Sequence, residues 1–211
     1  MNKYLIATLA LALAGACTSS FAQDTGAFFI NAGVGQAQLH VGRTDGPGYN
    51  VDDKDIAGAL RFGYAWRASS LEFGIEAGYV DLGKVVSSYH WTSSDGYDYE
   101  DVHAEAAASG WLAGVNGKYH LGSKWVVSAR AGEFRSTVDA SYSYSAYHYT
   151  EDASGSADGN GWYGGVGAGY DFTPNFGLSL NYDNYHVKAK TDAGSVDGNV
   201  GSYMLSAEYR F

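Results

Sequence analysis

Imidazole and carboxylate side chains, the groups that ligate metal ions or act as general bases, occur near one another at four places in this sequence. The histidines concerned are His90, His103, His148 and His186. Nothing in their spacing fixes them as one set of ligands on a single face of an element. We therefore expect no metal site and no cofactor.

Hydroxyl and carboxyl groups beside two of these histidines would suit nucleophilic catalysis, in which a base lies within hydrogen-bond reach of the nucleophile. Ser87 and Ser88 precede His90, and Asp183 precedes His186. Neither spacing resembles a hydrolase motif, so we expect no catalytic residues. A lipid-modifying or proteolytic enzyme remains the alternative.

Five further charged residues stand in segments that are otherwise apolar or small: Arg61, Glu72, Glu76, Lys118 and Arg130. If these segments are neighbouring strands with the charges on one face, the three cations would neutralise the two carboxylates. We expect such a charge network inside the fold. The alternative is a wet interior in which the charges are loosely solvated.

Eight segments are candidates for the strands that position these residues, because each carries an apolar residue at nearly every second position. They are residues 28–34, 60–66, 71–79, 111–119, 125–131, 162–172, 176–182 and 203–211. Successive side chains of a strand point to opposite faces, so each segment has one apolar face and one polar face. A composition of 29 Gly, 18 Tyr and 9 Phe with only 2 Pro also favours an all-β protein.

Two architectures fit these strands: a soluble β-sandwich with its charged faces in water, and a membrane barrel with its apolar faces in lipid. Tyr and Trp at the ends of the apolar rows favour the barrel, as do connections that alternate between short and long. The chain also ends on an aromatic residue, Phe211, in phase with the apolar face. We predict an all-β fold: an eight-stranded antiparallel up-and-down transmembrane β-barrel with short periplasmic turns and four long extracellular loops.

The four long loops lie near residues 41–55, 84–106, 136–158 and 186–198 and hold most of the 23 acidic residues. Tyrosine gives a large contact area at low entropy cost, so we regard the aromatic residues of two loops as candidates for recognition. The candidates are Tyr89, His90, Trp91, Tyr97, Tyr142, Tyr144, Tyr147 and Tyr149. The alternative is solvated loop tips whose rings pack on one another. The alternation in Ser141-Tyr-Ser-Tyr144 suggests strands that continue past the membrane.

Residues 1–22 are typical of a cleaved signal peptide, with Lys3 before an apolar stretch and a small-x-small site at Ser20-Phe21-Ala22. The mature barrel domain would then be residues 23–211. A rival cleavage before Cys17 would produce a lipid-anchored protein. The net charge of −10 argues against nucleic acid as a partner.

Three stretches resemble the OmpA-like and OmpX-like small eight-stranded outer-membrane barrels of Gram-negative bacteria: Leu71–Gly83, Gly164–Pro174 and Ser206–Phe211. The resemblance implies localisation in the cell outer membrane, next to lipopolysaccharide. It also implies the barrel-assembly machinery as a partner, with Tyr209 and Phe211 in the assembly signal that this machinery reads.

The resemblance also concerns the inside of the barrel. Glu76, Lys118 and Arg130 match the inward Glu, Lys and Arg of the third, fourth and fifth strands of the family. Gly169 and Ser179 stand where the family has an inward Glu and an inward Arg. Two opposite charges are absent together, so the interior must be connected differently.

The expected function is that of a non-enzymatic outer-membrane protein with a structural role in the envelope. Its surface loops would recognise or adhere to a host or other surface ligand. The acidic loop residues would bind divalent cations beside the phosphates of lipopolysaccharide. A lipid-modifying outer-membrane enzyme is one alternative, and a small pore is another, although eight strands leave an interior that side chains fill.

Overall fold

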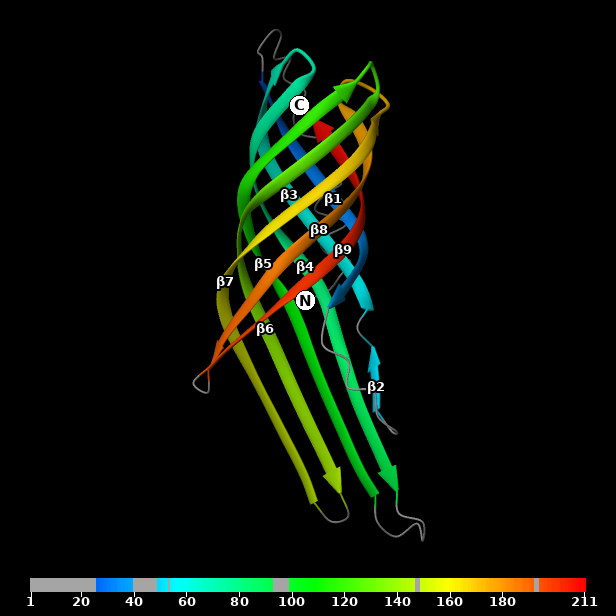
Figure 1. The fold of residues 1–211 in the computed structure, drawn as a ribbon, viewed down its shortest axis with the longest axis vertical. Coiled ribbons are helices and arrows are strands. Elements are labelled where there is room, and N and C mark those ends of the chain that lie inside the picture. Colours follow the sequence, from blue (N-terminus) through cyan, green and yellow to red (C-terminus); the bar gives the residue numbers. More distant parts are fainter. Residues whose placement is uncertain (1–25, 40–48, 53, 93–98, 147–148, 192–193) are drawn as a thin grey trace.

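Strands are the regular elements of the residues that the structure, a computed structural model, describes (Figure 1). These residues are 26–39, 49–52, 54–92, 99–146, 149–191 and 194–211. The strands are β1 (Gly26–Leu39), β2 (Tyr49–Asp52), β3 (Lys54–Ala68), β4 (Leu71–Thr92), β5 (Tyr99–Leu121), β6 (Trp125–Ala146), β7 (Tyr149–Asp171), β8 (Phe176–Thr191) and β9 (Gly194–Arg210). In this part of the chain, no helix is long and apolar enough to cross a membrane.

Eight of the nine strands hydrogen-bond to one another in a closed antiparallel ring. β1 pairs with β3 on one side and with β9 on the other, and the pairing of β4 with β5 completes the ring. The short strand β2 lies outside the ring, against β4. The predicted eight-stranded barrel is confirmed, and its closure gives the strand edges of the ring the partners that hydrocarbon cannot provide.

Apolar rows cover the outside of the ring, and charged side chains line its inside. Phe62, Ile75 and Leu180 expose 58%, 55% and 61% of their surface, whereas Arg61 exposes none. A soluble sandwich has the opposite arrangement, so this segregation is that of a barrel in lipid. The outward-facing aromatic rings include Trp66, Tyr119 and Trp125 near the short turns, and Trp111 and Trp162 towards the other end.

Three tight turns join β3 to β4, β5 to β6 and β7 to β8 at one end of the barrel, as the sequence predicts. Ser69 has a φ of 58° in the first turn, and Gly122 a φ of 76° in the second. In the third, the Phe176 amide donates a hydrogen bond of 2.9 Å to the hydroxyl of Thr173. These turns fix the register from which the inward positions follow.

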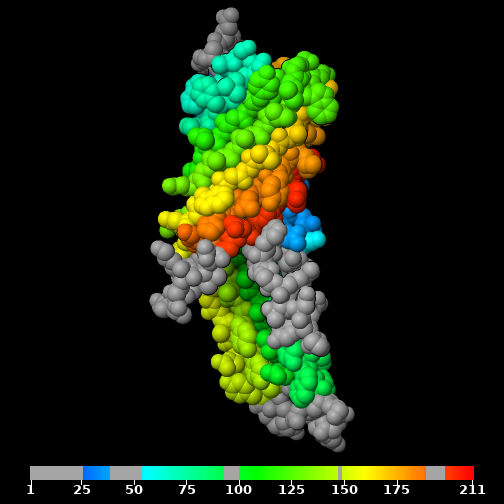
Figure 2. Space-filling view, viewed as in Figure 1, coloured from blue at the N-terminus to red at the C-terminus, as the bar shows by residue number. Residues whose placement is uncertain are grey.

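Three of the regions expected as long loops are largely strand: 84–106 and 136–158 (Figures 1 and 2), and 186–198, where β8 and β9 leave out only residues 192–193. The β4–β5 hairpin and the β6–β7 hairpin continue beyond the ring and pair with each other through β5 and β6. We call this four-stranded extension the protruding sheet. It forms because the side-chain pairs between neighbouring strands, which stabilise a sheet, continue along these strands beyond the membrane. Most of the region 41–55 lies outside the described residues.

Candidate functional site

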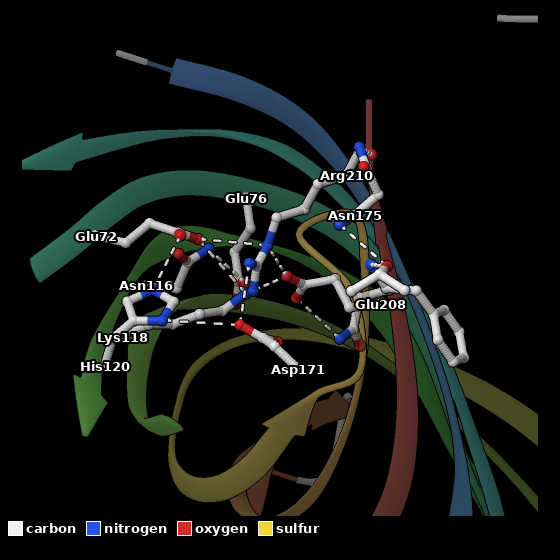
Figure 3. A network of polar contacts seen from close by, with 12 residues as sticks. Glu72, Glu76, Asn116, Lys118, His120, Asp171, Asn175, Glu208 and Arg210 are labelled. Carbon is white, nitrogen blue, oxygen red and sulfur yellow. Dashed lines mark hydrogen bonds and ion pairs between the residues drawn. The ribbon is translucent and has the colours of Figure 1, made fainter. Parts of the chain in front are cut away.

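A network of charged side chains closes the lumen at the turn end of the barrel (Figure 3). Lys118 contacts Glu208, and its Nζ lies 3.6 Å from Oε1 of Glu72. Arg210 lies 3.0 Å from Glu208 through Nε and 3.3 Å from Asp171 through Nη1. Arg210 also lies 3.8 Å from Oε1 of Glu72, so each cation is shared between two or three carboxylates and the loss of one group affects several pairs.

His120 connects the two sides of this network. Its Nε2 lies 3.4 Å from Oε2 of Glu72, and its Nδ1 lies 3.7 Å from Oδ2 of Asp171. Asn31 donates a hydrogen bond of 3.3 Å to Glu208. The groups come from β1, β4, β5, β7 and β9, so the network ties strands from all sides of the ring.

Glu76, the next inward carboxylate of β4, is bound by neutral donors. Asn116 Nδ2 donates to it over 2.9 Å, and the hydroxyl of Tyr163 donates over 2.8 Å. The Tyr163 ring lies against Gly114 and Gly132, where a Cβ would approach its hydroxyl oxygen to 2.6 Å and its Cε1 to 2.7 Å. Glycine at these two positions makes room for the ring that holds Glu76.

Arg61 crosses the lumen from β3 to β8. Its Nη2 donates to Oδ2 of Asp183 over 3.0 Å and to the hydroxyl of Tyr185 over 2.7 Å. Arg130 approaches the other oxygen of Asp183, with 3.7 Å between Nε and Oδ1. Asp183 thus bridges two arginines at the centre of the barrel.

A cluster of apolar side chains fills the lumen next to the protruding sheet. We call it the apolar plug, and it consists of Ala37, Ala57, Ala59, Val80, Leu82, Leu112, Phe134, Tyr163, Tyr185, Val187, Val200 and Met204. Phe134 meets Tyr185 edge to face, with 5.2 Å between ring centroids. The plug and the polar layers below it occupy the lumen with side chains, as the diameter of an eight-stranded barrel predicts.

The five residues expected to form one charge network all have side chains directed into the ring: Arg61, Glu72, Glu76, Lys118 and Arg130. Only Lys118 and Glu72 lie beside each other in the expected way. Arg61 and Arg130 approach Asp183 instead, because Tyr163 and Asn116 already surround Glu76.

Several residues of the lumen network are not among the five that the sequence predicts. Asp183, Glu208 and Arg210 stand in the polar phase of β8 and β9, and this phase was a usable signal. Tyr163 and Tyr185 carry no such signal, because a tyrosine near a strand end also fits the aromatic girdle of a membrane barrel.

The two sets considered for catalysis are not brought together. Asp183 is buried in the lumen, whereas the His186 ring lies outside and stacks on Trp162, with 5.7 Å between centroids. His90 contacts Asp101, and its Nε2 lies 3.1 Å from the hydroxyl of Thr92 rather than from Ser87 or Ser88. In the described part of the chain, no cluster of three or more His, Cys, Asp or Glu residues is arranged to hold a metal ion.

The protruding sheet has two unlike faces, set by its register. The face continuous with the lumen, which we call the aromatic face, carries Tyr89 and Trp91 on β4, Tyr142 and Tyr144 on β6, and Tyr149 on β7. Five of the eight recognition candidates therefore gather on one surface. The cause is a bulge between Asp81 and Lys84, which shifts the alternation of β4 by one residue.

The opposite face carries hydroxyl and charged groups, among them His90, His103, Glu105, Asp139 and Asp152. His90 is thus separated from the aromatic candidates. Two other candidates, Tyr97 and Tyr147, and also His148, lie outside the described residues.

The outer edge of the protruding sheet is formed by β7. Among the described strands, residues 149–158 pair with β6 alone, since β8 pairs with β7 only from Tyr163 onwards. Exposed edges are usually protected by charged side chains, above all Lys, by Pro or by a bulge. The charges of this edge are acidic, namely Glu151, Asp152 and Asp158, with no Lys or Pro between Tyr149 and Asp158.

Comparison with protein families gives one match. The family described as outer membrane protein beta-barrel domain matches residues 8–211. No curated protein matches the chain.

Solved structures of small outer-membrane barrels are similar in fold. Ail, the attachment invasion locus protein of Yersinia pestis, in complex with the heparin analogue sucrose octasulfate, is 18% identical, with a TM-score of 0.48, over 89% of this chain and 100% of Ail. OprG from Pseudomonas aeruginosa is 13% identical, with a TM-score of 0.48, over 90% of this chain and 97% of OprG. The outer membrane protease OmpT from Escherichia coli is 13% identical, with a TM-score of 0.48, over 92% of this chain and 99% of OmpT.

Proposed function

The chain belongs to the outer membrane protein β-barrel domain family, and from this membership we propose that it is a non-enzymatic barrel whose protruding sheet serves recognition or adhesion at the cell surface. The barrel would contribute to the envelope as a rigid anchor. The proposal includes cleavage of a signal peptide over residues 1–22, which leaves residues 23–211 as the mature domain.

The protruding sheet is the single observation that carries the proposal. β4 to β7 continue beyond the ring as a paired sheet and bring five aromatic side chains onto one face. Trp91, Tyr142 and Tyr149 expose 47%, 42% and 55% of their surface. Large, rigid and exposed aromatic rings are typical of recognition surfaces, because they lose little conformational entropy on binding.

The open edge of β7 gives a second reason to place recognition here. Unpaired backbone amides and carbonyls on a strand edge bind extended polypeptides by adding a strand. The acidic residues of this edge would repel the same edge of a second copy, so the edge favours a different partner.

A pore and an enzyme are less well supported than recognition. The apolar plug and the charged layers fill the lumen, which opposes the passage of solutes. Asp183 and His186 point to opposite sides of the barrel wall, which opposes their joint action as a catalytic pair.

Assembly and envelope contacts complete the proposal. Tyr209 lies at the end of β9 and Phe211 directly follows this strand, with 5.2 Å between their ring centroids, as a terminal signal for the barrel-assembly machinery would require. Acidic groups on the outer face of the protruding sheet, such as Glu105 and Asp139, would reach lipopolysaccharide phosphates through divalent cations.

The ligand of Ail is not carried over to this chain. Its solved complex contains a heparin analogue, which is an octasulfate. The protruding sheet here carries carboxylates on both faces, so we propose that sulfated ligands are disfavoured.

Truncation of the protruding sheet tests the proposal. Replacing residues 87–104 and 140–155 with Asn-Gly turns joins Val86 to Glu105 and Asp139 to Ser156, which are paired across each hairpin. We expect cells that carry the truncated barrel to lose attachment to host surfaces or matrix proteins, while the protein keeps its heat-modifiable mobility. Unchanged attachment would contradict recognition. Conductance across planar bilayers would instead support a pore, and an altered lipid A mass would support an enzyme.

A further inference from the structure

The aromatic face carries a groove that lies outside the lumen of the barrel. The groove has a volume of about 500 Å³ and spans all four strands of the protruding sheet. Its lining is mainly small and apolar and includes Val85, Ala104, Ala140, Tyr142, Ala153 and Gly155. Such a surface offers space and apolar contact to a slim hydrocarbon chain.

Tyrosines border the groove on the side of the hairpin tips. Tyr142 lines the groove, and Tyr144 follows two residues later on the same face of β6. The rings of Tyr144 and Tyr149 lie 6.2 Å apart between centroids. The faces of such rings carry negative electrostatic potential, which attracts ammonium groups.

Two carboxylates stand among these rings. The Tyr149 hydroxyl donates a hydrogen bond of 2.9 Å to Oε2 of Glu151, and the carboxylate of Glu100 lies near the hydroxyl of Tyr144. Desolvation and then the Glu100 contact raise the pKa of Tyr144, and the Glu151 hydrogen bond raises that of Tyr149. Both phenols therefore stay neutral, and the negative charge of the cluster comes from the carboxylates.

Basic residues are missing from the aromatic face. Its positions on the described parts of β4 to β7 beyond the bulge hold Val, Ser, Tyr, Trp, Ala, Gly and Glu, with no Lys, Arg or His. An anionic ligand would meet the carboxylates without a counter-charge, and a second copy of this face would bring two more carboxylates. Charge complementarity therefore selects a cation.

We propose that the aromatic face binds an amphipathic organic cation, with an apolar chain in the groove and an ammonium group at Tyr142, Tyr144 and Tyr149, between Glu100 and Glu151. This inference rests on the proposed function, because it names the ligand class of the protruding sheet. The occupant is a lysine side chain of a partner polypeptide, because the open edge of β7 beside this face can pair with an extended chain.

Titration of the full mature protein in lipid nanodiscs tests the site, with hexyltrimethylammonium as the probe. Tyrosine-ring NMR shifts and calorimetry report binding, and empty nanodiscs correct for partition into lipid. We expect saturable binding of hexyltrimethylammonium and about three- to tenfold weaker binding of tetramethylammonium, which lacks the chain. Hexyl sulfate, which has the same chain with an anionic head, should not bind.

Variants locate the site. Glu151→Gln and Tyr144→Leu should each weaken binding about three- to tenfold, whereas Tyr144→Phe keeps the ring and most of the affinity. Asp152→Asn, the neighbouring position on the opposite face, is the matched control and should change nothing. Because residues 149–152 are exposed, heat-modifiable mobility should show that Glu151→Gln and Asp152→Asn fold alike.

Three outcomes would overturn the proposal. Equal binding of hexyl sulfate would show unselective apolar association, and stronger binding of hexyl glucoside would identify a neutral sugar surface. Equal loss in Asp152→Asn and Glu151→Gln would place the cation on diffuse charge rather than in this site.

A second probe tests this occupant. A short acetylated peptide with Lys between leucines should bind more tightly than hexyltrimethylammonium, and weaker binding of the peptide would overturn the assignment to a polypeptide. Failure of every cation together with lost attachment of the truncated barrel would refute only this ligand class. Unchanged attachment would refute the proposed function itself.

Discussion

Arg61 and Asp183 form an ion pair with 3.0 Å between Nη2 and Oδ2, and neither side chain has any solvent-accessible surface. A charge at such a site depends on its partner, because water cannot replace the lost interaction. Lys84 and Glu105 lie at the same distance on the protruding sheet, with 49% and 30% of their side chains exposed. The two pairs therefore differ in burial rather than in geometry.

Substitution of Asp183 should destabilise the barrel strongly. Asp183→Asn leaves Arg61 and Arg130 without their shared carboxylate, and we expect a loss of about 3–5 kcal/mol in the free energy of unfolding. Urea titration followed by heat-modifiable mobility on gels measures it. Lys84→Ala is the matched control and should cost less than about 1 kcal/mol. Similar costs for both variants would contradict a desolvated pair at the centre of the lumen.

A side chain at position 132 should destabilise the barrel, because the neighbouring atoms leave no room for it. In Gly132→Ala the new Cβ would meet the carbonyl oxygen of Ala113 and would lie 2.6 Å from Cα of Gly114 and 2.7 Å from Cε1 of Tyr163, so the β5 backbone and the ring must both give way. We expect a cost of about 1–3 kcal/mol in unfolding free energy. Gly117→Ala, whose Cβ would meet only the Glu72 carbonyl oxygen at 3.8 Å, is the control and should be nearly neutral. A neutral Gly132→Ala would mean that neither the β5 backbone nor the Tyr163 ring is held in this position.

Truncation of an aromatic residue should cost more inside the barrel than outside. Phe134→Ala removes a ring that is 1% exposed from the apolar plug and leaves a cavity, for about 3–5 kcal/mol. Phe62 faces lipid, which fills the space left in Phe62→Ala, so the loss of unfolding free energy should be clearly smaller. Equilibrium unfolding of the two variants in the same lipid gives the comparison. The reverse order would place Phe62, rather than Phe134, in the interior.

The loss of unfolding free energy caused by a lysine on the lipid face should depend on its depth in the membrane. Ile75→Lys puts an ammonium group on the lipid face of β4 and should cost about 2–4 kcal/mol. Ile56, which is 68% exposed on β3 near the protruding sheet, lies towards the interface, and Ile56→Lys should cost about 0–1 kcal/mol. Folding into vesicles at increasing urea concentrations measures both. Equal losses of unfolding free energy in the two variants would contradict the placement of Ile75 in the hydrocarbon layer and of Ile56 near the interface.

The sequence predicts the barrel because one rule, apolar residues at alternate positions, applies to all eight strands. Phe62 and Arg61 are neighbours in the chain, and the rule alone sends one to lipid and the other to the lumen. The same rule cannot predict pairs across the lumen. Whether Arg61 reaches Glu76 or Asp183 depends on the shear of the ring and on the volume of Tyr163, which alternation does not contain.

The candidate recognition residues show the same limit. Their type and position in the chain identify Tyr142, Tyr144 and Tyr149 as surface aromatics. Their meeting on one face depends on the register between β6 and β7, and the side on which Tyr89 lies depends on the β4 bulge. A local irregularity of this kind requires one glycine and one hydrogen-bonding carboxylate, a signal too small to separate from an ordinary strand.

The β4 bulge decides more than local geometry. Gly83 adopts a φ of 72°, and the carboxylate of Asp55 accepts a hydrogen bond of 2.9 Å from the amide of Lys84. If all residues of β4 were kept in regular alternation without the bulge, Tyr89 and Trp91 would lie in phase with Tyr79 and turn outward with it. The bulge absorbs the extra residue, so deleting Gly83 would restore a regular ladder with β5 and leave Tyr89 and Trp91 on the aromatic face. A lineage can therefore gain or lose one residue at this point and keep the surface that the hairpin displays.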